Sequence, residues 1–356
     1  MLHGSDRFKP APVLRRRLPL AVGLLAVLSL GTLVAADPPP LTLVQTIPIP
    51  GVEGRIDHFD LDMPSQRLYV AALGNNTVEV IDLAIGTVVH HITGLKEPQG
   101  VAIVPDPHVL VIANGDDGSV AIYDAATYAL VRTVSLSGDA DNVRYDRDRR
   151  MVYVGFGSGG IAAIDPATGT VAKTMPLSGH PEAFVLESGG SRIFVNVPGS
   201  SQIAVLDRAT SASTVTWDLG KGYSGFFASM LGRVHANFPM ALDDASHRLF
   251  IGCRSPARML VFDTVAGIQV TQIDISGDID DLFYDQAARR IMASCGDGCI
   301  DMIEQTDPDH YRRSAVLPTA AGARTSWWVP ETRRLYLAVP HRGSQAAAVQ
   351  VFQVRP

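Results

Sequence analysis

Polar residues able to bind metals or transfer protons recur along the chain at regular intervals. They are carboxylates, histidines, side-chain amides and an arginine: Asp57, His58, Gln99, Asp141, Asn142, His180, Glu182, Asn237, Asp280, Asp281 and Arg324. Each stands just before a short apolar run typical of a β-strand. If these strands surround one axis, the polar residues gather at one mouth of a central channel. A concave site with convergent polar groups is the usual place for a ligand, so we expect a small molecule or a protein to bind there.

The types of these residues indicate the chemistry that such a mouth could perform. Oxygen donors with one or two imidazoles suit a divalent cation, or a polyhydroxylated or lactone substrate. For a cation, the expected ligands are Asp57, His58, Asp141, Glu182 and Asp280. In a metal-assisted lactonase the cation polarises the carbonyl and activates water, while a histidine or carboxylate acts as base. The alternative is structural: the same side chains could bond backbone amides of the neighbouring repeat. No catalytic residue is assigned.

Internal repeats show which elements position these residues. A run rich in Val, Ile, Tyr and Phe occurs seven times, beginning at Arg67, Val109, Met151, Arg192, Arg248, Arg290 and Arg334. A second run follows each copy and ends at Asp82, Asp124, Asp165, Asp207, Asp263, Glu304 and Gln353, in steps of 42, 41, 42, 56, 41 and 49 residues. A period near 42 with short β-type runs is typical of propeller blades. We therefore expect an all-β, seven-bladed β-propeller with four antiparallel strands per blade.

The two ends of the repeat array complement each other. The last repeat stops at its third strand, 348–354, whereas residues 41–47 have the character of a fourth strand. Open sheet edges are a liability, so we expect the N-terminal strand to close the last blade. The 56-residue step contains an insertion at about 218–235, between the fourth and fifth blades. This insertion is either a functional loop or a surface loop that packs its aromatic residues on a blade.

The first 36 residues have a different character. Three arginines at 15–17 precede an apolar run at 18–34, and Ala35 and Ala36 come before a proline-rich segment. This order predicts a signal peptide at 1–36 and a periplasmic or secreted propeller at 37–356, with no transmembrane domain in the mature chain. An uncleaved anchor is the alternative, although a 17-residue run is short for spanning a bilayer.

Charge argues against one class of partner. The whole chain has 30 basic and 36 acidic side chains, and five of the basic and one of the acidic residues lie in 1–36. The remainder therefore has 25 basic and 35 acidic residues and a formal charge of −10. Such a protein has no electrostatic reason to bind duplex nucleic acid, and none is expected as a partner.

Cysteines and glycines offer weaker signals. Cys295 and Cys299 flank a tight turn, where a disulfide, two reduced thiols or a metal pair are all open, while Cys253 stands alone. There is no C-x-x-C-H motif, so no covalent haem is expected. Residues 155–160 match G-x-G-x-x-G, but a strand-like run follows them instead of a helix. They therefore predict a turn inside the third blade, and no dinucleotide site.

The repeat resembles a known family. Residues 69–71, 111–114, 77–82 and 98–102 resemble the YVTN-type propeller repeat, and the resemblance extends over about 41–354. It implies the propeller fold. Similar repeats occur in surface-layer proteins, lactonase-like propellers and propeller subunits of quinone- or haem-linked enzymes, and fold analogy does not choose among them.

Three functions remain open, and whether the protein is an enzyme is open with them. The first is an exported scaffold that binds a ligand or protein at the channel mouth. The second is a lactonase-like hydrolase that could depend on a divalent cation, and the third is a periplasmic redox-partner subunit. A hydrolase requires three or more mouth carboxylates or histidines to converge on one point. A scaffold requires an exposed apolar patch instead.

Overall fold

A computed structural model of the chain describes residues 9, 11, 39–211, 213–219 and 235–356. Two compact units divide the chain, Met1–Pro38 and Pro39–Pro356, and every described strand lies in the second. The predicted signal peptide therefore lies almost wholly outside the described residues, as does most of the insertion at 218–235. No helix of the described part is long and apolar enough to cross a membrane.

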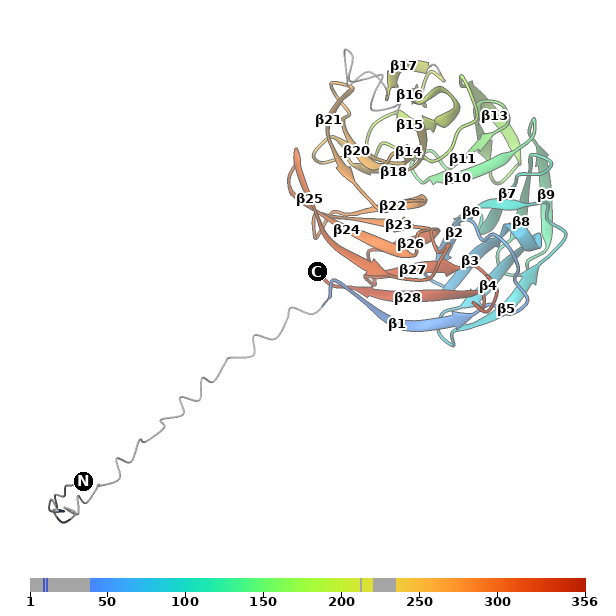
Figure 1. Cartoon of the computed structure of the whole chain (residues 1–356). Coiled ribbons are helices and arrows are strands. Elements are labelled where there is room, and N and C mark those ends of the chain that lie inside the picture. Colours follow the sequence, from blue (N-terminus) through green and yellow to red (C-terminus); the bar gives the residue numbers. More distant parts are fainter. Residues whose placement is uncertain (1–8, 10, 12–38, 212, 220–234) are drawn as a thin grey trace, which may run out of the picture. The chain divides into compact units, whose positions relative to one another are not determined.

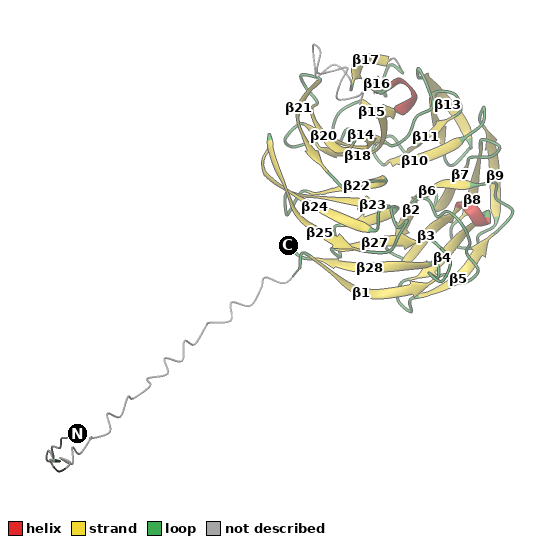
Figure 2. Ribbon diagram, viewed as in Figure 1, coloured by secondary structure: helices red, strands yellow, loops and turns green. Residues whose placement is uncertain are grey.

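Twenty-eight strands form seven four-stranded antiparallel sheets arranged around a central axis, which confirms the seven-bladed propeller (Figures 1 and 2). The first blade contains β2 (Phe59–Asp62), β3 (Arg67–Ala72), β4 (Thr77–Asp82) and β5 (Thr87–Ile92). The second contains β6 (Pro98–Val104), β7 (Val109–Asn114), β8 (Ser119–Asp124) and β9 (Leu130–Ser135). The third contains β10 (Ala140–Asp146), β11 (Met151–Phe156), β12 (Gly160–Asp165) and β13 (Thr170–Pro176).

The other four blades follow the same pattern. The fourth contains β14 (Phe184–Leu186), β15 (Arg192–Val197), β16 (Gln202–Asp207) and β17 (Ser213–Asp218). The fifth contains β18 (His235–Asp243), β19 (Arg248–Ser255), β20 (Ala257–Asp263) and β21 (Ile268–Asp274). The sixth contains β22 (Ile279–Asp285), β23 (Arg290–Cys295), β24 (Cys299–Asp307) and β25 (His310–Pro318). The seventh contains β26 (Ser326–Val329), β27 (Arg334–Val339), β28 (Ala348–Val354) and β1 (Leu41–Pro48), and two short 3₁₀ turns (Leu73–Asn75 and Pro198–Ser200) link strands in the first and fourth blades.

The aspartate that ends each third strand has a structural role. In five blades its Oδ1 accepts hydrogen bonds from the two backbone amides two and three residues further on, as Asp82 does from Ala84 at 2.8 Å and Ile85 at 3.3 Å. The equivalent bonds occur at Asp124, Asp165, Asp207 and Asp263. Asx turns of this kind fix the reversal into the outer strand, which explains why the repeat contains Asp there.

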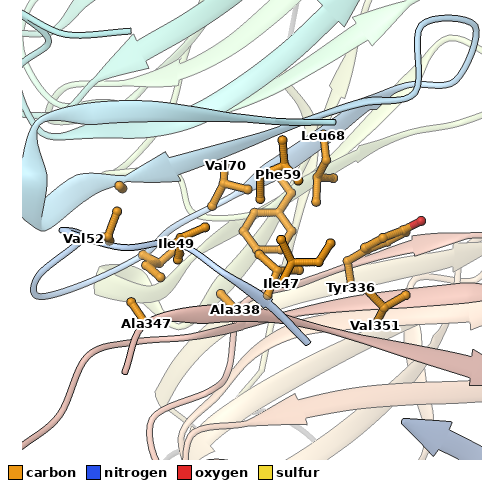
Figure 3. Packing of buried hydrophobic residues seen from close by; sticks show 14 of the residues in the cluster. Ile47, Ile49, Val52, Phe59, Leu68, Val70, Tyr336, Ala338, Ala347 and Val351 are labelled. Atoms are coloured by element: carbon orange, nitrogen blue, oxygen red, sulfur yellow. The ribbon is translucent and has the colours of Figure 1, made fainter. Parts of the chain in front are cut away.

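The ring closes through its N-terminal strand, as the sequence predicts. β1 pairs antiparallel with β28, from Leu41 opposite Val354 to Pro48 opposite Ala348. Ile47 is fully buried and packs in one apolar cluster with Phe59 of the first blade and Tyr336 of the seventh (Figure 3). The closing strand therefore supplies both ladder hydrogen bonds and core contacts between the first and last blades.

Candidate site at the channel mouth

A polar cavity of about 480 Å³, the mouth cavity, opens where the inner strands of the blades begin. Nine of the eleven predicted site residues line it: Asp57, His58, Gln99, Asp141, Asn142, His180, Glu182, Asp280 and Arg324. The inner strand of each blade starts at the same end of the channel, so residues far apart in the sequence converge there. The two remaining predictions, Asn237 and Asp281, do not line this cavity.

β-Bulges at the start of four inner strands direct some of these side chains. The register shifts between Pro98 and Val101 in β6 and between Ala140 and Val143 in β10, with similar shifts in β18 and β22. A bulge breaks the strict alternation of a strand and re-aims its side chains. The third blade shows the effect: neighbouring Asp141 and Asn142 both line the cavity, although adjacent residues of a regular strand face opposite sides.

Three side chains converge within the mouth cavity. One ligand atom each from Asp141, His180 and Glu182 lies within 4.8 Å of the other two. The Glu182 carboxylate makes no hydrogen bond or ion pair with the described residues, whereas its backbone amide donates to Asn196 O at 3.0 Å. We call these three residues the acid–histidine cluster.

His180 is oriented by the third blade. Its Nδ1 donates to the carbonyl oxygen of Gly157 at 2.8 Å, because a carbonyl can only accept. Nε2 then faces Asp141, with 3.9 Å between Nε2 and Oδ2. Gly157 lies in the G-x-G-x-x-G segment, which forms the turn between β11 and β12 as predicted. Metal-bound histidines commonly donate their second ring N–H to a carbonyl or carboxylate in this way.

The electrostatics of the cluster follow from burial and mutual proximity. Burial, together with repulsion from Asp141, raises the pKa of Glu182 to about 8. The Asp141 carboxylate raises the pKa of His180 to about 9. Burial opposes ionisation of Asp141, but the interaction with the protonated His180 prevails and lowers its pKa. In the absence of a cation, the cluster therefore holds protons on His180 and Glu182 at neutral pH.

The structure changes the ligand set expected from the sequence. Asp57 and Asp280 lie outside the acid–histidine cluster, and both are paired with arginines. Arg55 Nη2 donates to Asp57 Oδ2 at 2.6 Å, while Asp280 is paired with Arg254 and with Arg324, whose Nε lies 2.9 Å from Oδ2. Burial still raises the pKa of Asp57 to about 6. His180, which the sequence placed at the mouth but outside the metal set, takes a central position instead.

His58 lies beside the cluster and lines both the mouth cavity and a deeper cavity of about 230 Å³. Its Nε2 is 3.9 Å from Asp141 Oδ1, and its Nδ1 is 4.0 Å from Asp281 Oδ1. Burial lowers the pKa of His58 against the attraction of Asp141 and Asp280, so the imidazole is neutral at pH 7. Asp281 belongs to the deeper cavity, where it accepts a hydrogen bond from the Ser326 amide at 2.6 Å.

The prediction for Asn237 is wrong. Its side chain is fully buried between the fourth and fifth blades and does not reach the mouth cavity. Nδ2 donates to Asn196 Oδ1 at 2.8 Å and to Gln202 O at 3.1 Å. For this residue the structural alternative holds, because the amide joins two blades.

Sequence reasoning missed several residues that line the mouth cavity: Arg55, Glu97, Asp139, Arg254 and Phe238. Arg55, Glu97 and Asp139 stand beside predicted residues and could have been included by position. Arg254 offered no such signal, because it comes from the end of the second strand of its blade. It reaches the mouth by lying over the Phe238 ring, with Cζ 3.9 Å from the ring centroid.

The cysteines are free and buried in the structure. Cys295 and Cys299 face each other across the turn between β23 and β24. Burial raises the pKa of both thiols. The disulfide between them stays a prediction.

Comparison with known proteins supports the fold. No protein-family model matches the chain, and no curated protein matches it in sequence. Among solved structures, a chain of "Crystal Structure of Mitotic Checkpoint Complex" is similar with a TM-score of 0.73 at 16% identity, covering 96% of this chain and 99% of that one. A chain of "Kuenenia stuttgartiensis Hydrazine Synthase" is similar with a TM-score of 0.65 at 14% identity, covering 82% and 95%. At these identities the similarity establishes the β-propeller fold.

Proposed function

We propose that the protein binds a divalent cation at the channel mouth through Asp141, His180 and Glu182, and that this cation helps to hold a small oxygen-rich ligand. The convergence of these three side chains, with the Glu182 carboxylate lacking a hydrogen-bond or ion-pair partner among the described residues, supports the proposal. A half-buried carboxylate without a partner is costly, and a cation would remove that cost.

The spacing and chemistry of the cluster suit one ion. Ligand atoms that each lie about 2.0–2.6 Å from a common ion are up to about 5 Å apart, which accommodates the observed 4.8 Å limit. Imidazole favours zinc and other transition metals, whereas carboxylates also accept manganese, magnesium and calcium. One histidine with two carboxylates therefore favours Zn²⁺ or Mn²⁺ over Ca²⁺ and Mg²⁺.

Hydrolysis is a second candidate function, and His58 favours it. A cation at the cluster would polarise a carbonyl and lower the pKa of a bound water. His58 lies 3.9 Å from Asp141 and is neutral at pH 7, so it can accept a proton there. We expect His58→Gln to abolish hydrolysis of a sugar lactone, used as probe, while stoichiometric cation binding persists. A wild-type rate no higher than the uncatalysed rate would reject the hydrolase function, and equal catalysed rates in wild type and variant would reject His58 as the base.

The cellular setting is part of the proposal. The basic–apolar–small order of residues 1–36 supports export to the periplasm or the exterior, and the resemblance of the repeat supports a YVTN-type, lactonase-like propeller. For a protein-binding scaffold the structure offers less support. Exposed apolar side chains such as Leu43, Val89 and Leu130 lie on the outer strands of different blades.

Calorimetric titration of the cation-free protein with Zn²⁺, Mn²⁺, Ca²⁺ and Mg²⁺ tests the proposal. We expect one ion per chain and tighter binding of Zn²⁺ or Mn²⁺. Glu182→Gln should weaken binding by more than the roughly tenfold to hundredfold that loss of an outer hydrogen-bond partner costs. Glu97→Gln is the matched control, because Glu97 lines the same cavity outside the cluster. Absence of stoichiometric binding, or equal affinity in wild type and Glu182→Gln, would overturn the proposal and favour a partner-binding scaffold.

A further inference from the structure

A second cavity, of about 370 Å³, lies beside the mouth cavity where the first and seventh blades meet. Three loops supply its basic side chains: Arg55 precedes β2, Arg324 precedes β26, and His341 and Arg342 lie between β27 and β28. No carboxylate of the described chain lines it. We call this cavity the basic pocket.

Arg342 has no structural partner for its charged side chain among the described residues. Its side chain is exposed and makes no hydrogen bond or ion pair with any described residue. Its main chain, in contrast, is held tightly: Arg342 N donates to Gln345 O at 3.0 Å, and Gln345 N donates to Arg342 O at 2.9 Å. The Gln345 side chain ties the same loop to Ala321 O at 3.1 Å and to Pro340 O at 2.8 Å. The loop is therefore anchored while its guanidinium stays unpaired.

The guanidinium has a defined place over Gly322. A Cβ atom built on Gly322 would lie 2.4 Å from Arg342 Cζ, and Gly322 has a φ of +77°. Glycine is therefore favoured at 322 by its left-handed backbone, whereas the exposed Arg342 side chain could move away from a larger residue. The Arg342 guanidinium lies directly over the backbone of Gly322.

The other basic groups keep unused donors. Arg55 uses Nη2 for Asp57, and Arg324 uses Nη1 and Nε for Asp278 and Asp280. A guanidinium has five N–H donors, so each arginine retains some. Asp57 and Asp280 line the mouth cavity and not the basic pocket. His341 is paired with Glu53 at 2.6 Å, which leaves Arg342 as the charge in the pocket without a counter-ion among the described residues.

We propose that the basic pocket binds the carboxylate or phosphate group of a small anionic ligand. Arg342 and the free donors of Arg55 and Arg324 would grip that group, because guanidinium groups match planar and tetrahedral oxyanions. Arg55 and Arg324 line both cavities, so a ligand held here extends directly into the mouth cavity. This inference rests on the proposed function, since it names the ligand of that site as a small acid.

The test uses inorganic phosphate and acetate as probes, titrated separately into cation-free protein in a low-salt buffer and followed by calorimetry. We expect saturable binding of at least one probe, and the tighter of the two distinguishes a phosphate from a carboxylate ligand. Arg342→Ala should weaken that binding by at least about tenfold, because a charge-assisted contact is lost. Arg342→Lys should restore part of it. Arg132→Ala is the matched control, as Arg132 is an exposed arginine on the outer strand of the second blade.

Two results would overturn the proposal that the basic pocket binds an anion. One is equal affinity for the probes in wild type and Arg342→Ala. The other is probe binding that requires added Zn²⁺ and disappears in Glu182→Gln, since the anion would then be a ligand of the cation. A different result would show that only the proposed function fails. In that case Zn²⁺ would not bind, while phosphate or acetate would still bind in an Arg342-dependent manner.

Discussion

The imidazole of His180 donates a hydrogen bond from Nδ1 to the carbonyl oxygen of Gly157 at 2.8 Å, and this bond turns Nε2 toward Asp141. The histidine precedes the fourth blade, whereas the glycine lies in a hairpin of the third. Two neighbouring blades therefore set the direction in which the ring presents its second nitrogen. A ligand atom held in this way loses little conformational freedom when a cation binds.

Proton release should accompany cation binding. The pKa values of His180 and Glu182 are raised to about 9 and about 8, so both groups hold protons at neutral pH and a cation must displace them. We expect the apparent affinity for Zn²⁺ to increase as the pH rises toward about 8. Titrations in two buffers of different ionisation enthalpy will count the protons, and Glu182→Gln should release fewer. An affinity that does not change with pH would contradict this assignment.

In the cation-free protein, Glu182 should make the folding stability decrease as the pH rises. A carboxyl whose pKa is higher in the folded than in the unfolded state binds more protons when folded, so folding stability falls as the pH rises between the two values. For Glu182 that window runs from 4.5 to about 8. Glu182→Gln should therefore gain several kcal/mol relative to wild type between the lower and upper ends of this window, since one unit of pKa difference corresponds to about 1.4 kcal/mol. Urea unfolding at both ends measures the difference, and Glu97→Gln should show none.

Asn237 should matter for stability and not for binding. Asn237→Ala leaves Asn196 Oδ1 and Gln202 O without their buried donor, and we expect a loss of about 1–3 kcal/mol in the free energy of unfolding. The affinity for Zn²⁺ should remain that of the wild type. If cation binding were lost at unchanged stability, Asn237 would belong to the site after all. Denaturant unfolding and calorimetry on the same preparation separate the two results.

Ile47 should be among the most sensitive positions of the closing strand. It is fully buried between the first and seventh blades, so Ile47→Ala should cost about 2–5 kcal/mol of unfolding free energy. Val44→Ala on the same strand is the control, because that side chain is 52% exposed. Similar unfolding midpoints for the two variants would show that the strand contributes ladder hydrogen bonds alone.

Much of the fold could be predicted because each blade repeats the same local pattern. In the second blade, β7 begins at Val109 and β8 ends at Asp124, where the repeat places them, and β28 spans Ala348–Val354 as expected. Closure of the ring by β1 could be predicted because the repeat array has an extra strand at its N-terminal end and lacks a fourth strand in its last repeat. These features depend on the alternation of apolar and polar residues, on turn residues and on unpaired strand edges, which can all be recognised in short stretches of sequence.

The location of the site could be predicted from the sequence, but the side-chain contacts within it could not. The mouth contains Asp141, His180 and Glu182 as expected, yet the sequence did not separate them from Asp57 and Asp280. That separation depends on which carboxylates meet an arginine, and Arg254 arrives from a different strand position. The bulges that re-aim Asp141 and Asn142 also depend on pairing between strands, and Asn237 shows that a polar residue at the right repeat position can still face a blade interface.

The pairing of β1 with β28 has a consequence for how the protein matures. These strands are the first and last of the propeller, so the ring cannot close until the final blade has been synthesised. Contacts this distant in sequence form slowly, and until then both edges offer unpaired backbone to other chains. Asp57 joins the mouth from the first blade, whereas Asp280 and Arg324 join it from the last two. A newly made chain would thus acquire the complete mouth only at the last step of folding, and ligand binding there would report that step.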